Sequence, residues 1–108
     1  MSTDKPLGYA ATLILSALRA GARYGLEVID RTGRSSGTVY PALRRLEAAG
    51  LVEAHWEDRE EAHDDRRPAR RYYRITPEGD RALERARERF RARQNALGWD
   101  EADPTGAS

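Results

Sequence analysis

The stretch of residues 35–52 constrains the fold of this chain more than any other, and it reads SSGTVYPALRRLEAAGLV. Hydroxyl side chains open the stretch, apolar residues recur at helical spacing through its middle, and Gly50 precedes a strand-like run. Serine suits the start of a helix and glycine suits its end. We therefore expect a helix from Ser35 or Ser36 to about Ala49, with a core face formed by Val39, Ala42, Leu43 and Leu46.

Two further helices precede this one. Apolar residues at helical spacing predict a first helix over Leu7–Arg19, which Gly21 ends. A shorter helix is expected over Tyr24–Arg31, and Gly33 ends it.

Two strands are expected after the third helix. Residues 51–58 alternate, with Val52, Ala54 and Trp56 on one side and Glu53, His55 and Glu57 on the other. Residues 69–76 also alternate and turn Tyr73 and Ile75 inward, while the polar segment 59–68 between the strands suits an exposed hairpin loop. Three helices followed by a two-stranded ribbon is the order of a winged helix-turn-helix domain, a mainly α (α+β) fold.

The last helix begins at Thr76-Pro77, because threonine caps helices and proline favours the first helical position. Its apolar residues form a narrow stripe typical of a seam between two helices rather than of a globular core. The predicted dimer interface is Leu83, Ala86, Phe90 and Leu97. We thus expect a winged helix domain over 7–76, a C-terminal dimerisation helix over 77–99, and a disordered tail over 100–108.

Composition excludes several classes of protein. No cysteine is present, so disulfides, a thiolate nucleophile and cysteine zinc sites are excluded. The apolar run 10–18 is too short for a membrane span, and we expect neither a signal peptide nor an anchor, which favours the cytoplasm. His55 and His63 belong to no catalytic arrangement. We expect no enzyme, cofactor or metal site.

The start of the third helix predicts contacts with DNA. A helix N-terminus favours phosphate, the hydroxyl side chains here can bind it, and glycine lets the backbone approach it closely. The predicted contacts are Ser35, Ser36, Gly37, Thr38 and Tyr40. Arg44 and Arg45, one turn later, suit phosphates or a guanine edge, and Tyr24 is a further phosphate candidate. In the alternative interpretation, the serines only cap the helix and the arginines only face solvent.

Charge in the predicted wing is divided into two blocks. Residues 51–65 carry seven acidic side chains and one basic one, whereas residues 66–76 carry five arginines and no acid. Arg66, Arg67 and Arg70 are predicted to contact the DNA backbone or minor groove. Pairing of these arginines with the wing carboxylates, Glu57 among them, is the competing explanation.

Three segments resemble the PadR family of bacterial transcription regulators: residues 24–29 (YGLEVI), residues 36–52, and residues 70–79 (RRYYRITPEG). The resemblance implies a homodimeric winged helix protein, usually a repressor, on a palindromic operator in double-stranded DNA. It implies a short-form member, some of which bind flat aromatic or drug-like molecules at the dimer centre. Trp99 either lies in an exposed tail or lines such a pocket. The segment between Ile29 and Ser36 is shorter than the family pattern, and the wing loop is more acidic.

Two alternatives stay open at this point. A MarR-like regulator shares the winged helix and the dimer but usually adds N-terminal helices, and this chain has little before Leu7. A winged helix module whose arginines bind an acidic protein partner is the second alternative.

Overall fold

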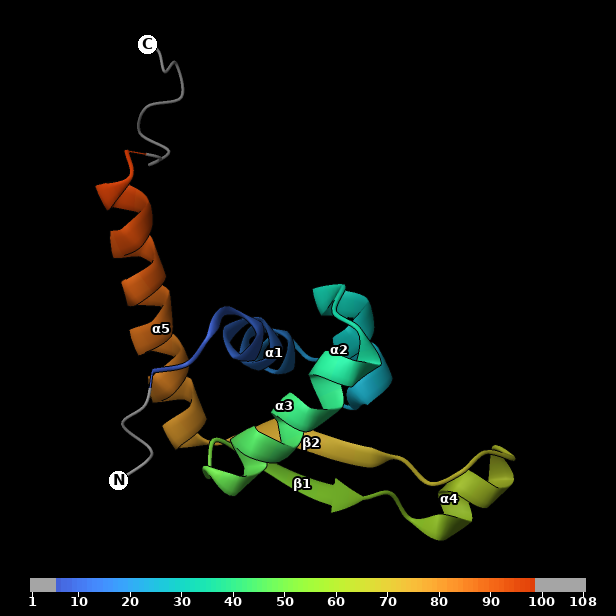
Figure 1. The fold of residues 1–108 in the computed structure, drawn as a ribbon. Helices are drawn as coiled ribbons and strands as arrows, with labels where there is room; N and C mark the ends of the chain where they lie inside the picture. Colours follow the sequence, from blue (N-terminus) through green and yellow to red (C-terminus); the bar gives the residue numbers. More distant parts are fainter. Residues whose placement is uncertain (1–5, 99–108) are drawn as a thin grey trace.

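A computed structural model describes residues 6–98 of the chain (Figure 1). The element order is α1 (Tyr9–Arg19), α2 (Gly25–Thr32), α3 (Ser36–Ala48), β1 (Val52–Trp56), α4 (Arg59–Asp64), β2 (Arg71–Ile75) and α5 (Pro77–Ala96). This order confirms the predicted winged helix-turn-helix. None of the helices in the described part of the chain has the length and apolar character that crossing a membrane requires.

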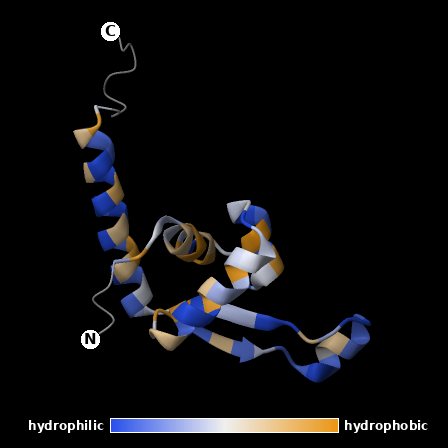
Figure 2. Ribbon diagram, viewed as in Figure 1, coloured by the Kyte–Doolittle hydropathy of each residue, from blue (hydrophilic) through white to orange (hydrophobic). Residues whose placement is uncertain are grey.

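Helix α1 lies at the centre of the core and packs against α2, α3, α5 and β2. Ile14 and Leu15 on α1 are fully buried, and they join Val28 of α2, Leu43 of α3 and Leu83 of α5 in one apolar cluster. Figure 2 accordingly shows α1 largely in the hydrophobic colour, whereas hydrophilic and hydrophobic residues alternate along α5. The core face predicted for α3 is confirmed, because Val39, Ala42, Leu43 and Leu46 are all buried.

Strands β1 and β2 pair antiparallel, with Val52 opposite Ile75 and Trp56 opposite Arg71. The other edge of β2 pairs with the chain just before α2, where the Tyr73 N–H donates to the Arg23 carbonyl at 2.8 Å. The sheet thus ties the start of α2 to the hairpin, and the hairpin extends beyond the core away from α5 (Figure 1).

The hairpin differs from the prediction in two ways. Residues 59–68 were expected to form a loop, but Arg59–Asp64 forms the short helix α4, in which Ala62 is buried. The prediction that Trp56 faces inward and Glu57 faces outward is wrong, since Trp56 is 63% exposed and Glu57 is only 7% exposed. Beyond Ala54 the ribbon has left the apolar core, so alternation no longer separates core from solvent. Glu57 is instead buried by ion pairing within the wing.

The junction between the sheet and α5 forms as predicted. The Thr76 Oγ1 accepts a hydrogen bond from the Gly79 N–H at 3.0 Å and donates to the Gly50 carbonyl at 2.8 Å. Gly50 adopts a left-handed backbone with φ of 78° and ends the α3 segment. Pro77 begins α5.

The apolar stripe of α5 is divided, and half of the predicted seam requires correction. Leu83 and Ala86 are fully buried within the chain itself, because α1 packs against this part of α5. A side chain with no exposed surface in one chain has none left for a partner. Phe90 is partly buried, with its ring against that of Tyr9 at 5.8 Å, and Leu97 is 60% exposed. Trp99 and the expected tail 100–108 lie outside the described residues.

We expect Gly79→Ala to destabilise the fold, because a Cβ atom there would lie 2.1 Å from the Leu51 carbonyl oxygen. Backbone cannot move aside as a side chain does, and overpacking of this kind costs about 1–3 kcal/mol or more. Gly37→Ala is the matched control: it is also a helical glycine, but its nearest contact would be the Ser35 Oγ at 3.8 Å. Urea unfolding should show a large loss of stability for the first variant and none for the second. Equal stabilities would contradict the described junction.

Candidate nucleic-acid interface

The N-terminus of α3 is open to a ligand. Ser35 occupies the cap position, and its carbonyl accepts hydrogen bonds from the Thr38 and Val39 N–H groups at 3.0 and 2.9 Å. No side chain caps the helix; the Ser35 Oγ lies 3.4 Å from the Thr38 Oγ1 instead. Ser35, Ser36 and Gly37 are exposed. The first turn of α3 thus offers hydroxyls, backbone N–H groups and the positive end of the helix dipole to an anion.

Arg44 and Arg45 lie further along the same helix and are both exposed. Among the described side chains of residues 6–98, from which Glu61 is excepted, neither forms an ion pair with a carboxylate. Their guanidinium groups therefore remain available to a ligand. A planar guanidinium suits a phosphate or a guanine edge, as expected from the sequence.

Tyr40 has a structural contact that the sequence did not indicate. Its ring packs so closely on Gly25 that a Cβ atom at Gly25 would lie 2.3 Å from the Tyr40 Cε1. Gly25 begins α2, so the contact fixes the distance between α2 and α3. Tyr40 is half-buried and holds the helix-turn-helix pair together.

The fold brings Tyr24 and Arg70 together from distant parts of the sequence. The Arg70 guanidinium lies 4.1 Å from the centre of the Tyr24 ring, and the Tyr24 ring meets the edge of Tyr72 at 5.7 Å. A cation over an aromatic face is attracted by the ring quadrupole. Two predicted DNA-binding residues thus form one unit where α2 meets the wing.

A buried carboxylate at Glu57 organises the wing. Its two oxygens accept hydrogen bonds from the Arg67 Nη1 and Nη2 at 2.6 and 2.7 Å, and Oε1 also accepts from the Arg70 N–H at 3.1 Å. The Tyr72 hydroxyl donates to Oε2 at 3.3 Å. The hydrogen bonds from Arg67 lower the pKa of Glu57 from 4.5 to about 2, and the same contacts raise the pKa of Arg67. We call these four residues the wing clamp.

The wing arginines therefore differ in whether they are engaged in ion pairs within the chain. The internal pairing left open by the sequence is present for Arg67, which contacts Glu57 and Asp65 and whose side chain is only 22% exposed. Arg71 and Arg74 pair with Glu47 and Glu53. Arg66 and Arg70 make no ion pair with any of the described side chains, which do not include that of Glu61. Arg66 is exposed and has a left-handed backbone, with φ of 56°, just after α4.

Trp56 is a candidate residue that the sequence interpretation missed. Its indole is 63% exposed, and the Arg71 guanidinium lies 5.4 Å from it while also bonding Glu47 of α3. Trp56 therefore lies beside α3 on the sheet face that carries this helix. The alternating pattern of the strand predicted a buried Trp56. The pattern does not reveal that the strand leaves the apolar core after Ala54, which is why Trp56 is exposed.

Residues 14–85 match the sequence profile of the transcriptional regulator PadR-like family. The fold is similar to a PadR family transcription regulator from hypervirulent Clostridium difficile R20291, with 27% identity and a TM-score of 0.73 over 84% of this chain and 96% of that one. A transcriptional regulator from Clostridium thermocellum is 29% identical, with a TM-score of 0.70 over 84% and 88% of the two chains. The PcaV regulator from Streptomyces coelicolor, solved with its natural ligand, is 27% identical, with a TM-score of 0.71 over 94% and 69%. No curated protein sequence matches this chain.

We expect Glu57→Gln to destabilise the protein near neutral pH and to remove one component of its pH dependence. Folding lowers the pKa of Glu57 from 4.5 to about 2, so its stabilising contribution is complete above about pH 4.5 and is lost as the pH falls toward 2. Thermal unfolding of both proteins should give a difference in Tm at pH 6 that closes toward pH 2. Glu60→Gln, at an exposed residue of the same wing, is the control. A difference in Tm that does not vary with pH would refute the clamp.

Proposed function

Because this chain belongs to the PadR-like family of transcriptional regulators, we propose that it acts as a homodimeric repressor that binds a palindromic operator and is released by a small aromatic ligand. The protein is a DNA-binding regulator rather than an enzyme. The observation that carries the proposal is the open first turn of α3, followed by two arginines without ion pairs in the described chain. The profile match favours this family over the MarR-like alternative.

In the proposed complex, α3 enters the major groove with its N-terminal end leading. The hydroxyls of Ser35, Ser36 and Thr38 and the helix N–H groups hold phosphates, while Arg44 and Arg45 reach base edges. Arg66 and Arg70 hold the flanking backbone, with Tyr24 supporting Arg70. Arg67 acts mainly through the wing clamp, since its guanidinium already bonds Glu57 and Asp65.

The proposed dimer uses the outer half of α5. Phe90 and Tyr9 form an aromatic pair that is partly exposed, and Leu97 presents an apolar side chain that is 60% exposed. Residues 91–98 are all exposed, so this segment has its surface available for a second copy. A two-fold dimer requires half-sites about one helical turn of DNA, roughly 34–36 Å, or a multiple of it apart.

Binding of a small molecule is supported by one similar regulator rather than by this chain. The PcaV regulator, 27% identical, was solved with its natural ligand. We propose that this chain is also regulated by a flat aromatic molecule, with Trp99 as a contact near the dimer centre. Because the proposed target is DNA, we propose that the protein acts in the cytoplasm.

The proposal is tested by fluorescence anisotropy with duplex DNA from upstream of the protein's own gene, at two salt concentrations. Specific binding should survive competition by a scrambled duplex. Equal, salt-sensitive binding to both duplexes would refute an operator-specific regulator, because a basic surface alone behaves in that way. The alternative, an acidic protein partner, would then explain the arginines better.

We expect Arg44→Ala to relax sequence preference, since a bidentate arginine–guanine contact contributes roughly 1–3 kcal/mol of discrimination. Arg66→Gly should instead weaken binding to all sequences alike and reduce the slope of log K against log salt by about 1. Glycine suits the left-handed backbone at residue 66, so the second variant removes charge without disturbing the turn. The same anisotropy titration on operators with single base changes measures both. Identical profiles for the two variants would overturn the assigned roles.

We expect Leu97→Asp to convert dimers to monomers in sedimentation velocity, because it places a charge in the proposed seam. The folded chain does not depend on this side chain, which is 60% exposed. Leu26→Asp is the matched control, since Leu26 is 61% exposed on α2. Phe90→Asp should act as Leu97→Asp does. A dimer that persists in both α5 variants would exclude this seam.

A further inference from the structure

Arg34, which directly precedes the Ser35 cap of α3, makes a contact that the complex proposed above does not use. Its guanidinium lies 5.6 Å from the centre of the Tyr9 ring, at the start of α1. Arg34 is exposed, and it pairs with no carboxylate among the described side chains, which do not include that of Glu61. A cation over an aromatic face is attracted by the ring quadrupole. Tyr9 therefore restricts the positions that this cation adopts.

The backbone of Arg34 is fixed as well. Gly33 ends α2 in a left-handed conformation, with φ of 70°. The Arg34 N–H then donates to the Thr32 Oγ1 at 3.2 Å, and this hydroxyl donates to the Val28 carbonyl at 2.8 Å. The turn between α2 and α3 is thus bonded to α2 through its backbone and contacts α1 through its arginine side chain.

Tyr9 in turn is held by α5. Its ring meets the ring of Phe90 edge to face, with ring centres 5.8 Å apart and planes at 82°. The neighbouring Arg89 Nη2 donates to the Leu7 carbonyl at 2.7 Å, and the Arg93 guanidinium lies 5.0 Å from the centre of the Phe90 ring. The start of α1 is therefore attached to α5 by a hydrogen bond and by an aromatic contact.

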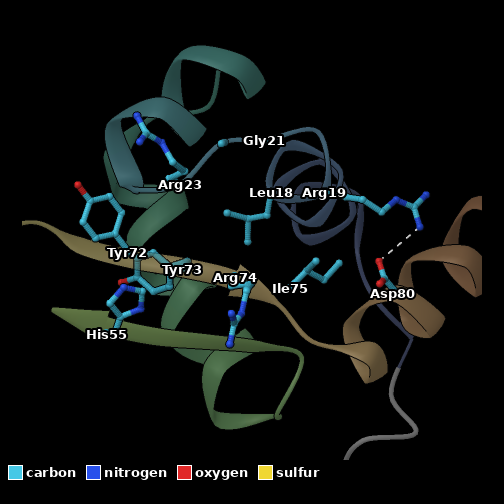
Figure 3. Close-up of a pocket in the computed structure, with 11 residues that line it drawn as sticks. Leu18, Arg19, Gly21, Arg23, His55, Tyr72, Tyr73, Arg74, Ile75 and Asp80 are labelled. Carbon is cyan, nitrogen blue, oxygen red and sulfur yellow. Dashed lines mark ion pairs between the residues drawn. The ribbon is translucent and has the colours of Figure 1, made fainter. Parts of the chain in front are cut away.

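The other end of α1 is attached to α5 too. Figure 3 shows Arg19 reaching from α1 to Asp80 of α5, and its Nη1 lies 3.5 Å from the Asp80 Oδ1. The Arg19 Nη2 also donates to the Glu84 Oε2 at 2.6 Å. Because α1 packs against α5 and is attached to it at both ends, the two helices form one unit. The position of α5 therefore sets the position of Tyr9.

We propose that Tyr9 is a positioning residue for DNA binding, which holds the Arg34 guanidinium in place to contact a backbone phosphate beside the start of α3. A guanidinium that is already ordered loses less entropy when it binds, which improves affinity about two- to tenfold for one side chain. Through Phe90, the same contacts connect the proposed dimer seam to the DNA-binding surface. The phosphate contact rests on the proposed function, whereas the ordering of Arg34 by Tyr9 stands without it.

The ordering of Arg34 is tested on the full-length protein without DNA, by NMR relaxation of the arginine Nε–Hε groups. In the wild type, the order parameter of Arg34 should exceed those of Arg44 and Arg45, which are exposed and make no described ion pair. Tyr9→Leu should lower it to their level, whereas Tyr9→Phe, which keeps the ring, should not. Tyr9 is 58% exposed, so neither substitution disturbs the core. An Arg34 that is as mobile as Arg44 in the wild type, or that stays ordered in Tyr9→Leu, would overturn the proposed contact.

The phosphate contact is tested by fluorescence anisotropy with the upstream duplex and the scrambled duplex over a series of salt concentrations. Arg34→Gln should weaken binding to both duplexes alike and reduce the slope of log K against log salt by about 1, because one phosphate contact is lost. Tyr9→Leu should weaken binding about two- to tenfold and leave the slope unchanged, since the cation is still present. Arg85→Gln, at an exposed arginine of α5, is the control for net charge and should change neither quantity. An unchanged affinity and slope in Arg34→Gln would exclude the phosphate contact.

The positioning role is tested by combining the substitutions. In the Arg34→Gln background, Tyr9→Leu should have no further effect on binding, whereas a loss that persists there would show that Tyr9 acts only on the fold and would overturn the proposal. Phe90→Leu, compared at concentrations at which sedimentation shows both proteins to be dimers, should follow the same pattern, and a loss independent of Arg34 would refute the connection to the seam. A wild type that binds neither duplex would contradict the proposed function, and the NMR measurement would still decide whether Tyr9 orders Arg34.

Discussion

The packing of α1 against α2, α3, α5 and β2 is the contact on which the rest of the structure depends. A chain of 108 residues can build only one apolar cluster, and here Ile14 and Leu15 fill its centre. Helix α3, strand β2 and the inner half of α5 all pack against this one helix. The helix proposed to bind DNA and the helix proposed to form the dimer seam are therefore connected through α1.

The sequence predicted the elements well where apolar periodicity and glycine agreed, as in α3 from its serine start to Gly50. The prediction failed where one pattern of apolar residues is compatible with two different packing arrangements. The stripe on α5 suited a partner helix or α1 equally well, and the structure divides it, with Leu83 inside and Leu97 outside. Alternation in β1 could not indicate where the ribbon leaves the core, so Glu57 was assigned to solvent. The short helix α4 has no apolar period from which it could be recognised.

The candidate site was predictable in its residue types but not in its electrostatics. Three of the five arginines in residues 66–76 form ion pairs with glutamates. These glutamates lie on α3 (Glu47), on β1 (Glu53) and directly after β1 (Glu57). Counting charges along the sequence therefore overestimates the cationic field of the wing. Arg44 and Arg45 of α3, in contrast, pair with no carboxylate among the described side chains, so no neighbouring acid offsets their charge.

The exposed outer turns of α5 have a consequence for how this protein folds. Residues 91–98 are all exposed, so the last turn and a half of α5, which ends at Ala96, has no tertiary packing within the described chain. Within one chain, its helical state depends on the packed inner turns of α5, which nucleate the helix. If a second copy supplies that surface, order in these turns follows the monomer–dimer equilibrium, and dilution melts them while the α1 core stays folded. The regulator would then complete its own structure only above a threshold concentration in the cell.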